Sequence, residues 1–183
     1  MIAEFGHFAL VLALMLAVAQ GTLPLFGAHR GNLAWMAVAS AAARAQCLFV
    51  LLAFAALVLA FAQNDFSIAY VVSNSNSALP LAYRISAVWG AHEGSLLLWV
   101  LILALWTTAV SFFSGGLPAA FRARVLAVMG LISVGFLLFV LLTSNPCLRP
   151  LTAAADGADL HPPPHAPRLI IHPPLLYIGY IGF

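Results

Sequence analysis

The sequence predicts an all-α integral membrane protein with four transmembrane helices and the start of a fifth. Of its 183 residues, 64% are hydrophobic and 7% are charged, whereas about a quarter of the residues in a soluble domain are charged. Four long apolar runs each approach the roughly 20 residues that a helix needs to cross a bilayer. The net charge of +2, without a basic cluster interleaved with aromatic residues, argues against a nucleic-acid partner.

The first two predicted spans cover about residues 5–26 and 45–62. The first lacks the basic n-region of a signal peptide and is longer than an h-region, so we expect a retained membrane anchor. An alanine-rich stretch from Trp35 is expected to extend the second helix towards its N-terminus, because alanine is the strongest helix former.

The third and fourth predicted spans cover about residues 94–113 and 125–142, and an incomplete fifth covers 173–183. The fifth consists of "PPLLYIGYIGF", and eleven residues do not cross a bilayer. We therefore interpret the chain as a fragment or as one part of a split protein.

The distribution of arginine predicts a periplasmic N-terminus. The chain has no lysine, and four of its seven arginines lie in the two short loops between predicted spans. They are Arg30, Arg44, Arg122 and Arg124. Short cytoplasmic loops are rich in basic residues, so these loops are predicted to be cytoplasmic. The N-terminus and the segments 63–93 and 143–172, which together contain all five acidic residues, then face the periplasm from a bacterial inner membrane.

Each outward segment has about thirty residues, a length at which loops are usually functional or disordered. The stretch "YVVSNSNSALPLAYR" mixes polar with apolar and aromatic residues, so we expect it to lie along the membrane surface as a docking segment. The stretch "LHPPPHAPRLIIHPP" contains six prolines and is expected to be largely extended or turn-like. Cys147 is expected to be an exposed thiol outside the cytoplasm, and Cys47 a small buried residue.

The first candidate site is "WGAHEGSLLLW", at the start of the third span. One helical stripe contains residues at intervals of three or four, namely Trp89, His92, Leu96, Trp99, Leu103 and Trp106. Glu93 lies beside the stripe in the first turn, where the helix dipole favours an acid. In a structural interpretation the tryptophans are interfacial anchors and packing residues, and His92 pairs with Glu93. In a functional interpretation the tryptophans stack on a flat apolar anionic ligand, whose carboxylates bind His92 and Arg84.

The second candidate site is "LIIHPPLLYIGY", in which His172 precedes two prolines. Prolines are tolerated in the first turn of a helix, so the fifth helix is predicted to begin at Pro173, with His172 at or just outside its start. A histidine held rigidly beside an apolar surface suits an axial haem ligand, and the alternative is an ordinary interfacial histidine. His161 and His165 lie nearby, but the intervening prolines and the lack of an acid or thiol argue against a zinc site.

These motifs resemble the cytochrome c-type biogenesis proteins of the CcmF and NrfE type. The matching strings are "NDFSIAYVVSNSNSALPLAYRISAVWGAHEGSLLLW", "NPCLRPL", "DGADL" and "LIIHPPLLYIGYIGF". They occur in order along nearly the whole chain, and the first and last are long and specific. The chain resembles only the N-terminal portion of the family, because full members are several times longer.

This resemblance implies a component of the haem lyase that matures c-type cytochromes. Such proteins accept haem b, their substrate, from a periplasmic haem chaperone. Together with other haem lyase subunits they attach it to the CxxCH thiols of apocytochrome c by thioether bonds. His172 matches the first of two periplasmic histidines that ligate this haem. The second such histidine, a tryptophan-rich motif and the histidines of a structural haem b lie further along in the family. Without that C-terminal portion, this chain is expected to be inactive.

The first candidate site is expected to contribute to haem or chaperone docking, with packing of the third span as the open alternative. Its residues are Arg84, Trp89, His92, Glu93 and Trp99. A second hypothesis is a proton- or ion-translocating subunit, with His92, Glu93 and Arg44 as relay groups. The third and fourth spans have few polar groups and the acids lie on one side, which favours surface chemistry over a relay. A third hypothesis is a scaffold that binds no haem.

Overall fold

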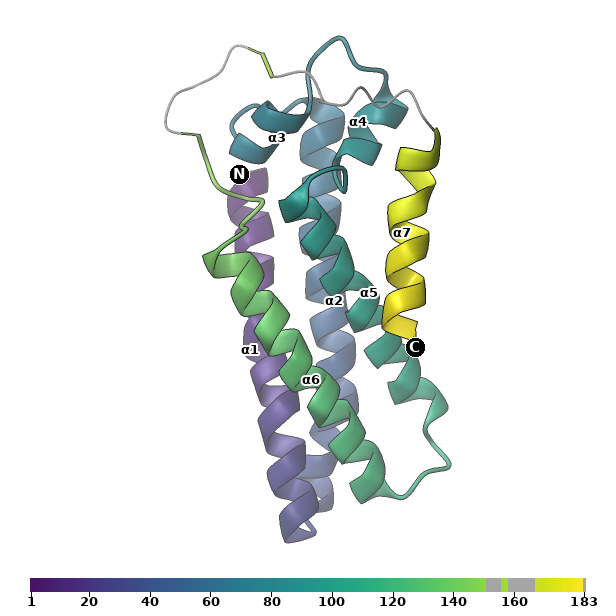
Figure 1. The fold of residues 1–183 in the computed structure, drawn as a ribbon. Coiled ribbons are helices and arrows are strands. Elements are labelled where there is room, and N and C mark those ends of the chain that lie inside the picture. The colour runs from purple at the N-terminus through teal and green to yellow at the C-terminus, as the bar shows by residue number, and fades with distance from the viewer. Residues whose placement is uncertain (151–155, 158–166, 183) are drawn as a thin grey trace.

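The computed structural model describes residues 1–150, 156–157 and 167–182, and these residues contain seven helices (Figure 1). In chain order they are α1 (Ile2–Arg30), α2 (Leu33–Gln63), α3 (Ala69–Asn74), α4 (Leu81–Ala87), α5 (His92–Phe113), α6 (Ala119–Leu142) and α7 (Pro167–Gly182). No strand occurs within these described ranges.

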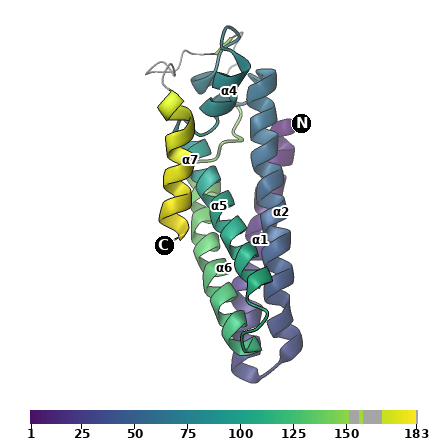
Figure 2. The same cartoon turned by 90° about the vertical axis from the view of Figure 1, so that its right-hand side faces the viewer.

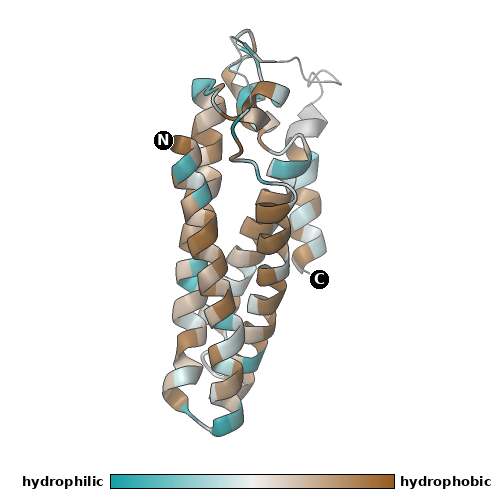
Figure 3. Ribbon diagram, turned by 90° about the vertical axis from the view of Figure 1, so that its left-hand side faces the viewer, coloured by the Kyte–Doolittle hydropathy of each residue, from teal (hydrophilic) through white to brown (hydrophobic). Residues whose placement is uncertain are grey.

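The four long helices α1, α2, α5 and α6 are apolar and long enough to cross a membrane. They confirm the predicted class, an all-α integral membrane protein with four transmembrane helices. Figure 3 shows hydrophobic residues along these helices and hydrophilic residues near both ends of the bundle. The shorter helix α7 lies beside α5, on the side of the bundle away from α1 and α2 (Figure 2).

A two-residue connection joins α1 to α2. Gly31 has a φ of 68° and ends α1 in the left-handed conformation that glycine adopts without strain. The side-chain oxygen of Asn32 accepts hydrogen bonds from the N–H groups of Ala34 and Trp35, at 3.0 and 3.2 Å, and so caps α2. Because α2 begins at Leu33, the predicted alanine-rich extension of the second span is confirmed.

Small residues let the long helices pack closely. A β-carbon on Gly130 of α6 would lie 3.0 Å from the amide nitrogen of Gly21 in α1, so the two backbones approach each other there. Beside this contact, Nε2 of Gln20 donates a hydrogen bond of 2.7 Å to the carbonyl of Leu126 in α6. Lipid removes the hydrophobic drive for helices to associate. Close packing and interhelical hydrogen bonds therefore hold them together.

The structure corrects the predicted start of the fifth hydrophobic helix. Helix α7 begins at Pro167 rather than Pro173, so His172 lies inside the helix, five residues after its first residue. Pro167 takes the first-turn position, where a missing N–H group costs nothing. Pro173 and Pro174 lie in the interior and leave carbonyls one turn earlier without a helical donor. This part of α7 therefore depends on contacts with the bundle for its orientation.

Helices α3 and α4 cover one end of the bundle, here called the α3–α4 end, where the N-terminus and the start of α5 also lie (Figure 1). The amide of Ala69 at the start of α3 donates a hydrogen bond of 2.8 Å to the carbonyl of Leu148. The amide and hydroxyl of Ser77 donate to the carboxylate of Asp156, at 3.1 and 2.7 Å. These bonds, with one from the amide of Gly157, lower the pKa of Asp156. The outward segment 63–93 thus contains two short helices, and hydrogen bonds from the start of α3 and from Ser77 tie it to residues that follow α6.

Candidate functional site

The two motifs predicted to carry function lie side by side on α5 and α7 (Figure 2). The hydroxyl groups of Ser95 in α5 and Tyr177 in α7 form a hydrogen bond. The rings of Trp99 and Tyr177 meet edge to face, with centroids 5.7 Å apart and planes at 67°. Ser95 and Trp99 belong to "WGAHEGSLLLW", and Tyr177 belongs to "LIIHPPLLYIGY". Side-chain contacts therefore join the two strings.

The predicted stripe on α5 packs against both α6 and α7. The centroid of the Trp99 ring lies 5.7 Å from that of Phe136 in α6, so aromatic rings from two helices contact this tryptophan. Trp106 lies against the end of α7, where a β-carbon on Gly182 would be 3.1 Å from the indole Cζ2. These contacts give Trp99 and Trp106 a packing role.

His92 and Glu93 occupy the first turn of α5. Glu93 is half-buried, in the position where the helix dipole favours an acid. His92 is exposed, and its ring stands edge-on to Phe139 of α6 with centroids 6.3 Å apart. Trp89 precedes the helix and packs, partly buried, against the core. An apolar groove of about 380 Å³ lies next to His92 and is lined by Leu96, Ile132, Gly135, Phe136 and Phe139.

A close backbone approach fixes the start of α5. The hydroxyl of Tyr70 in α3 donates a hydrogen bond of 3.0 Å to the carbonyl of Val88. A β-carbon on Gly94 would lie 1.6 Å from that carbonyl oxygen and 2.8 Å from the Tyr70 hydroxyl. Burial raises the pKa of the Tyr70 phenol, so the hydroxyl keeps its proton and remains a donor at neutral pH. The missing side chain of Gly94 therefore lets α3 close over the first turn of α5.

Arg84 ties α4 to the end of α2. Its Nη1 donates a hydrogen bond of 3.0 Å to the carbonyl of Ala62, in the last turn of α2. This bond satisfies a carbonyl that lacks an intrahelical donor, and the helix dipole favours a cation there. The half-buried guanidinium also has a buried Nε without a hydrogen-bond partner among the described residues. Binding of a ligand carboxylate by Arg84 stays a prediction.

His172 lies on the exposed side of α7. Leu175 and Leu176 follow it by three and four residues, so they share its face of the helix, and both are exposed. Tyr177, which contacts α5, lies on a different face. The structure therefore presents an imidazole on an apolar surface, an arrangement that fits axial ligation of a flat apolar macrocycle.

The predicted site residues fall into two groups. In the part of the chain that the structure describes, no hydrogen bond or ring contact joins His172 to His92 or Glu93. The link between the groups passes through Ser95 and Tyr177, which the sequence interpretation missed. A serine one turn before Trp99 and a tyrosine in the run "PPLLYIGYIGF" were the available signals. Neither signal identifies which helices become neighbours.

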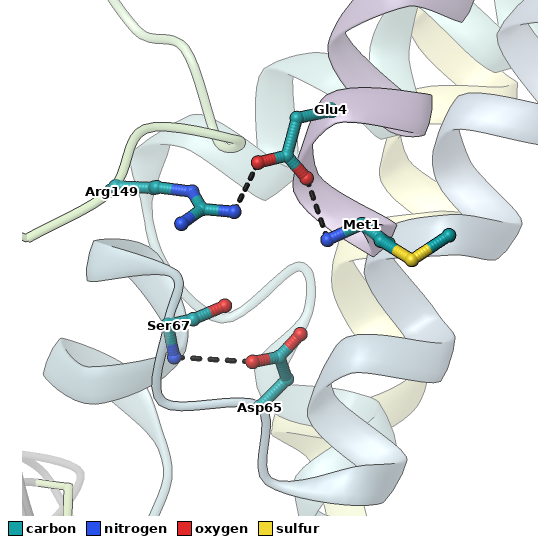
Figure 4. A network of polar contacts seen from close by, with 5 residues as sticks. All are labelled: Met1, Glu4, Asp65, Ser67 and Arg149. Carbon is teal, nitrogen blue, oxygen red and sulfur yellow. Dashed lines mark hydrogen bonds and ion pairs between the residues drawn. The ribbon is translucent and has the colours of Figure 1, made fainter.

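A second polar cluster holds the start of α1 to the segment after α6 (Figure 4). Glu4 forms ion pairs with the N-terminal amine of Met1, at 2.7 Å, and with the guanidinium of Arg149. The amide nitrogen of the Asn145 side chain lies 3.0 Å from Nδ1 of His7. These contacts fix residues 145–149 against the first turns of α1.

Cys147 is buried, which corrects the expectation of an exposed thiol. The segment after α6 folds back onto α1, and a β-carbon on Gly6 would lie 2.9 Å from Sγ of Cys147. The side-chain oxygen of Asn145 also accepts a hydrogen bond of 3.0 Å from the amide of Cys147. Burial raises the pKa of the thiol to about 11. Cys47 is buried, as predicted.

Alkylation of Cys147 is expected to be slow in the folded protein. The thiolate is the reactive form, so at pH 8 a pKa of about 11 lowers the rate on the order of a hundredfold relative to an unperturbed thiol. The rate should rise as the pH increases towards that value. Iodoacetamide labelling of a Cys47→Ala protein, followed by mass spectrometry, measures this rate, and the same protein in denaturing detergent is the control. Equal rates in the folded and denatured samples at pH 8 would contradict the buried position.

No set of three or more histidine, cysteine, aspartate or glutamate side chains converges on a metal-ion site within the described ranges. His161 and His165 lie outside these residues. The interpretation that they form no zinc site therefore stays a prediction.

Comparison with known proteins finds the same similarity in sequence and in structure. The profile of the family described as "Cytochrome C assembly protein" matches residues 89–183, beginning at the first residue of "WGAHEGSLLLW". Cytochrome c-type biogenesis protein CcmF of Pseudomonas aeruginosa is 59% identical over all of this chain, which covers 28% of that protein. CcmF of Escherichia coli is 52% identical with the same coverage. Protein NrfE of Haemophilus influenzae is 40% identical over all of this chain and 29% of its own length.

A solved structure of similar fold is named "Cytochrome c Heme Lyase CcmF". It superposes with a TM-score of 0.84 at 29% sequence identity, over 100% of this chain and 28% of that chain. The chain thus spans less than a third of the length of the curated relatives it matches.

Proposed function

Because this chain belongs to the cytochrome c assembly protein family, we propose that it forms the N-terminal part of a cytochrome c haem lyase component. In this proposal the protein accepts haem b from a periplasmic haem chaperone and promotes its covalent attachment to apocytochrome c. The similarity to proteins named for cytochrome c biogenesis supports the pathway, and the surface around His172 supports the contact with haem.

The contact with haem is proposed because the imidazole of His172 is exposed on an apolar face of α7. It shares its helix face with Leu175 and Leu176, whose side chains are 62% and 40% exposed. The nitrogen would ligate the iron and the leucines would contact the apolar edge of the macrocycle, which excludes water from that side. Pro173 and Pro174 fix φ next to the ligand and limit the conformations that His172 samples.

The haem, when bound, supplies vinyl groups across which the apocytochrome thiols add, with sulfur bonding to one carbon and the proton going to the other. The part played by this chain is to hold and orient the macrocycle through His172. Residues for the remaining steps are expected in the portion of the relatives that this chain does not cover, together with the structural haem b site. On its own the chain is proposed to be inactive.

The arrangement of arginines supports a location in a bacterial inner membrane with the α3–α4 end in the periplasm. Arg30 lies in the last turn of α1, and Arg122 and Arg124 lie in the first turns of α6, at the end of the bundle opposite α3 and α4. These three arginines flank short connections, and basic residues near such connections favour the cytoplasmic side. Arg44, which was predicted to lie in a short loop, lies inside α2 instead. The proposed partners at the periplasmic end are the haem chaperone, the apocytochrome, the other haem lyase subunits and the remaining portion of the protein.

The placement of the charged residues disfavours a proton or ion relay. Arg44 donates a hydrogen bond of 3.0 Å to the carbonyl of Ser40, and its guanidinium lies over the ring of Phe112 at 5.4 Å. Phe112 is nineteen residues after Glu93 on α5, which corresponds to roughly 28 Å along a helix axis. A relay between Glu93 and Arg44 would have to cross an apolar span.

The proposal predicts that His172→Ala, in the full-length protein, weakens haem binding by more than about tenfold and abolishes most c-type cytochrome formation. Titration of the purified protein with ferric haem b, followed by absorption, measures the binding. His29→Ala is the matched control, because His29 is also exposed but lies at the far end of α1. Wild-type titration and cytochrome formation in His172→Ala would refute the ligand role and favour a scaffold that binds no haem here.

A further inference from the structure

We propose that Tyr177, through its contacts with Ser95 and Trp99, is a positioning residue that sets the direction in which His172 faces. This inference rests on the proposed function, because it assigns a role to residues around the same ligand. It also assigns Ser95 and Trp99, in the string "HEGSLLLW", a role in orienting α7 that does not require contact with haem.

The anchor consists of one hydrogen bond and one aromatic contact. The hydroxyls of Ser95 and Tyr177 form the bond, and the Tyr177 ring meets Trp99 edge to face at 5.7 Å. Trp99 is in turn packed against Phe136, with ring centroids 5.7 Å apart. The partner of Tyr177 is therefore held by α6 as well as by its own helix, so it provides a fixed reference for α7.

The proline pair makes this anchor necessary. Pro173 and Pro174 cannot donate hydrogen bonds, so the carbonyls of residues 169 and 170, just before His172, lack their helical donors. The first turns of α7 are therefore held less firmly by the helix itself, and the orientation of His172 depends on the part of α7 that follows it and on the contacts of that part with neighbouring helices. Tyr177 is half-buried against α5, whereas Leu175 and Leu176, the two residues before it, are exposed.

Because Tyr177 and His172 lie on the same helix, the direction of one side chain determines the direction of the other. Five residues correspond to a rotation of about 140° and a rise of about 7.5 Å on an α-helix. When Tyr177 faces α5, His172 therefore points away from the bundle, as observed. Any rotation of α7 about its axis turns the imidazole through the same angle, so loss of the anchor spreads His172 over several directions and lowers the fraction that can ligate.

In this inference Trp99 supports α7 and does not stack on a ligand. Its ring is already in contact with Phe136 and Tyr177, so it acts as the support of α7. His92, which is exposed beside the apolar groove, remains available for docking.

The test compares Ser95→Ala, Tyr177→Phe and the double variant in the full-length protein with two matched controls. Tyr180→Phe also removes a tyrosine hydroxyl from α7, but Tyr180 is 70% exposed. Ser133→Ala removes a hydroxyl that bonds only within its own helix, to the carbonyl of Met129 at 3.0 Å. The readouts are the apparent dissociation constant for ferric haem b, the ratio of low-spin to high-spin absorption, and the thermal unfolding midpoint.

Each single variant at Ser95 or Tyr177 is expected to bind ferric haem b about fivefold more weakly. Loss of one ordinary hydrogen bond lowers by about this factor the fraction of molecules in which His172 is oriented to ligate the iron. The bound haem of each single variant should show a larger high-spin share. The double variant should be no weaker than either single variant, because both remove the same bond. Both controls should titrate as the wild type.

A changed unfolding midpoint with unchanged affinity and spin ratio would show that the pair serves stability alone and would overturn the inference. So would equal effects of Tyr177→Phe and Tyr180→Phe. His172→Ala separates this failure from failure of the proposed function. If His172→Ala loses haem while Tyr177→Phe titrates as wild type, only the positioning role is refuted. If His172→Ala itself titrates as wild type, the ligand role fails and the positioning role fails with it.

Discussion

Replacement of Gly94 by alanine is expected to prevent the α3–α4 end from folding, whereas replacement of Gly90 by alanine is expected to be tolerated. The β-carbon of an alanine at position 94 would lie 1.6 Å from the carbonyl oxygen of Val88. That oxygen belongs to the backbone and cannot rotate away. At position 90 the closest atom, the carbonyl oxygen of Ala87, would be 3.4 Å from the new carbon, which is an ordinary contact.

Relief of this clash requires the start of α5 to separate from the preceding turn. The separation would move the Val88 carbonyl away from the hydroxyl of Tyr70, which now donates to it at 3.0 Å. A buried phenol would then lack its acceptor, in addition to the displaced backbone. Destabilisation above about 4 kcal/mol is expected, a size that single substitutions reach only through such mechanisms.

The comparison of Gly94→Ala with Gly90→Ala can be measured in detergent by thermal unfolding and by size-exclusion chromatography of the purified proteins. The Gly94 variant should yield little monodisperse protein or unfold at a much lower temperature. Because α7 packs on the same helix through Ser95, haem binding should be lost as well. Two variants with equal midpoints would mean that the Val88 carbonyl does not lie over Gly94.

Composition was sufficient to predict the membrane spans, because an apolar run as long as the one in α6 is typical of a transmembrane helix and not of a soluble domain. Apolar residues from Val125 to Leu142 leave a helix across the bilayer as the structure that satisfies every backbone polar group. The start of the second helix was predicted to within two residues, because the alanine-rich stretch from Trp35 extends the apolar run that begins near residue 45. Asn32 fixes the observed start, since its side chain caps α2 at Leu33.

Long-range contacts explain what the sequence did not predict. The position of Cys147 just after a span indicated exposure, but the fold-back of residues 145–149 onto α1 buries the thiol against Gly6. Similarly, "HPP" indicated a helix beginning at Pro173, whereas Pro167 supplies the first-turn proline and the pair lies within α7. The pairing of Ser95 with Tyr177 connects residues 82 positions apart, and local patterns contain no information about such a pair.

Substitution of Gly130 by leucine is expected to destabilise the bundle by at least about 2 kcal/mol, whereas leucine at Gly135 on the same helix is expected to be neutral or stabilising. A β-carbon at position 130 would meet the amide nitrogen of Gly21 at 3.0 Å and Cγ of Gln20 at 3.1 Å, and further atoms of leucine would have no space. At position 135 nothing lies within 4 Å of the new carbon.

The difference between the two variants follows from how helices associate in lipid. At Gly130, α1 and α6 would have to move apart, which also lengthens the bond of 2.7 Å from Gln20 to the Leu126 carbonyl and leaves a buried amide without its acceptor. At Gly135, leucine would fill part of the apolar groove and replace a residue of low helix propensity. Thermal unfolding of the two variants in the same detergent measures this contrast. A Gly130→Leu protein as stable as Gly135→Leu would show that α1 and α6 are not in close contact there. The two unfolding temperatures therefore test whether the backbones of α1 and α6 are in close contact at Gly130.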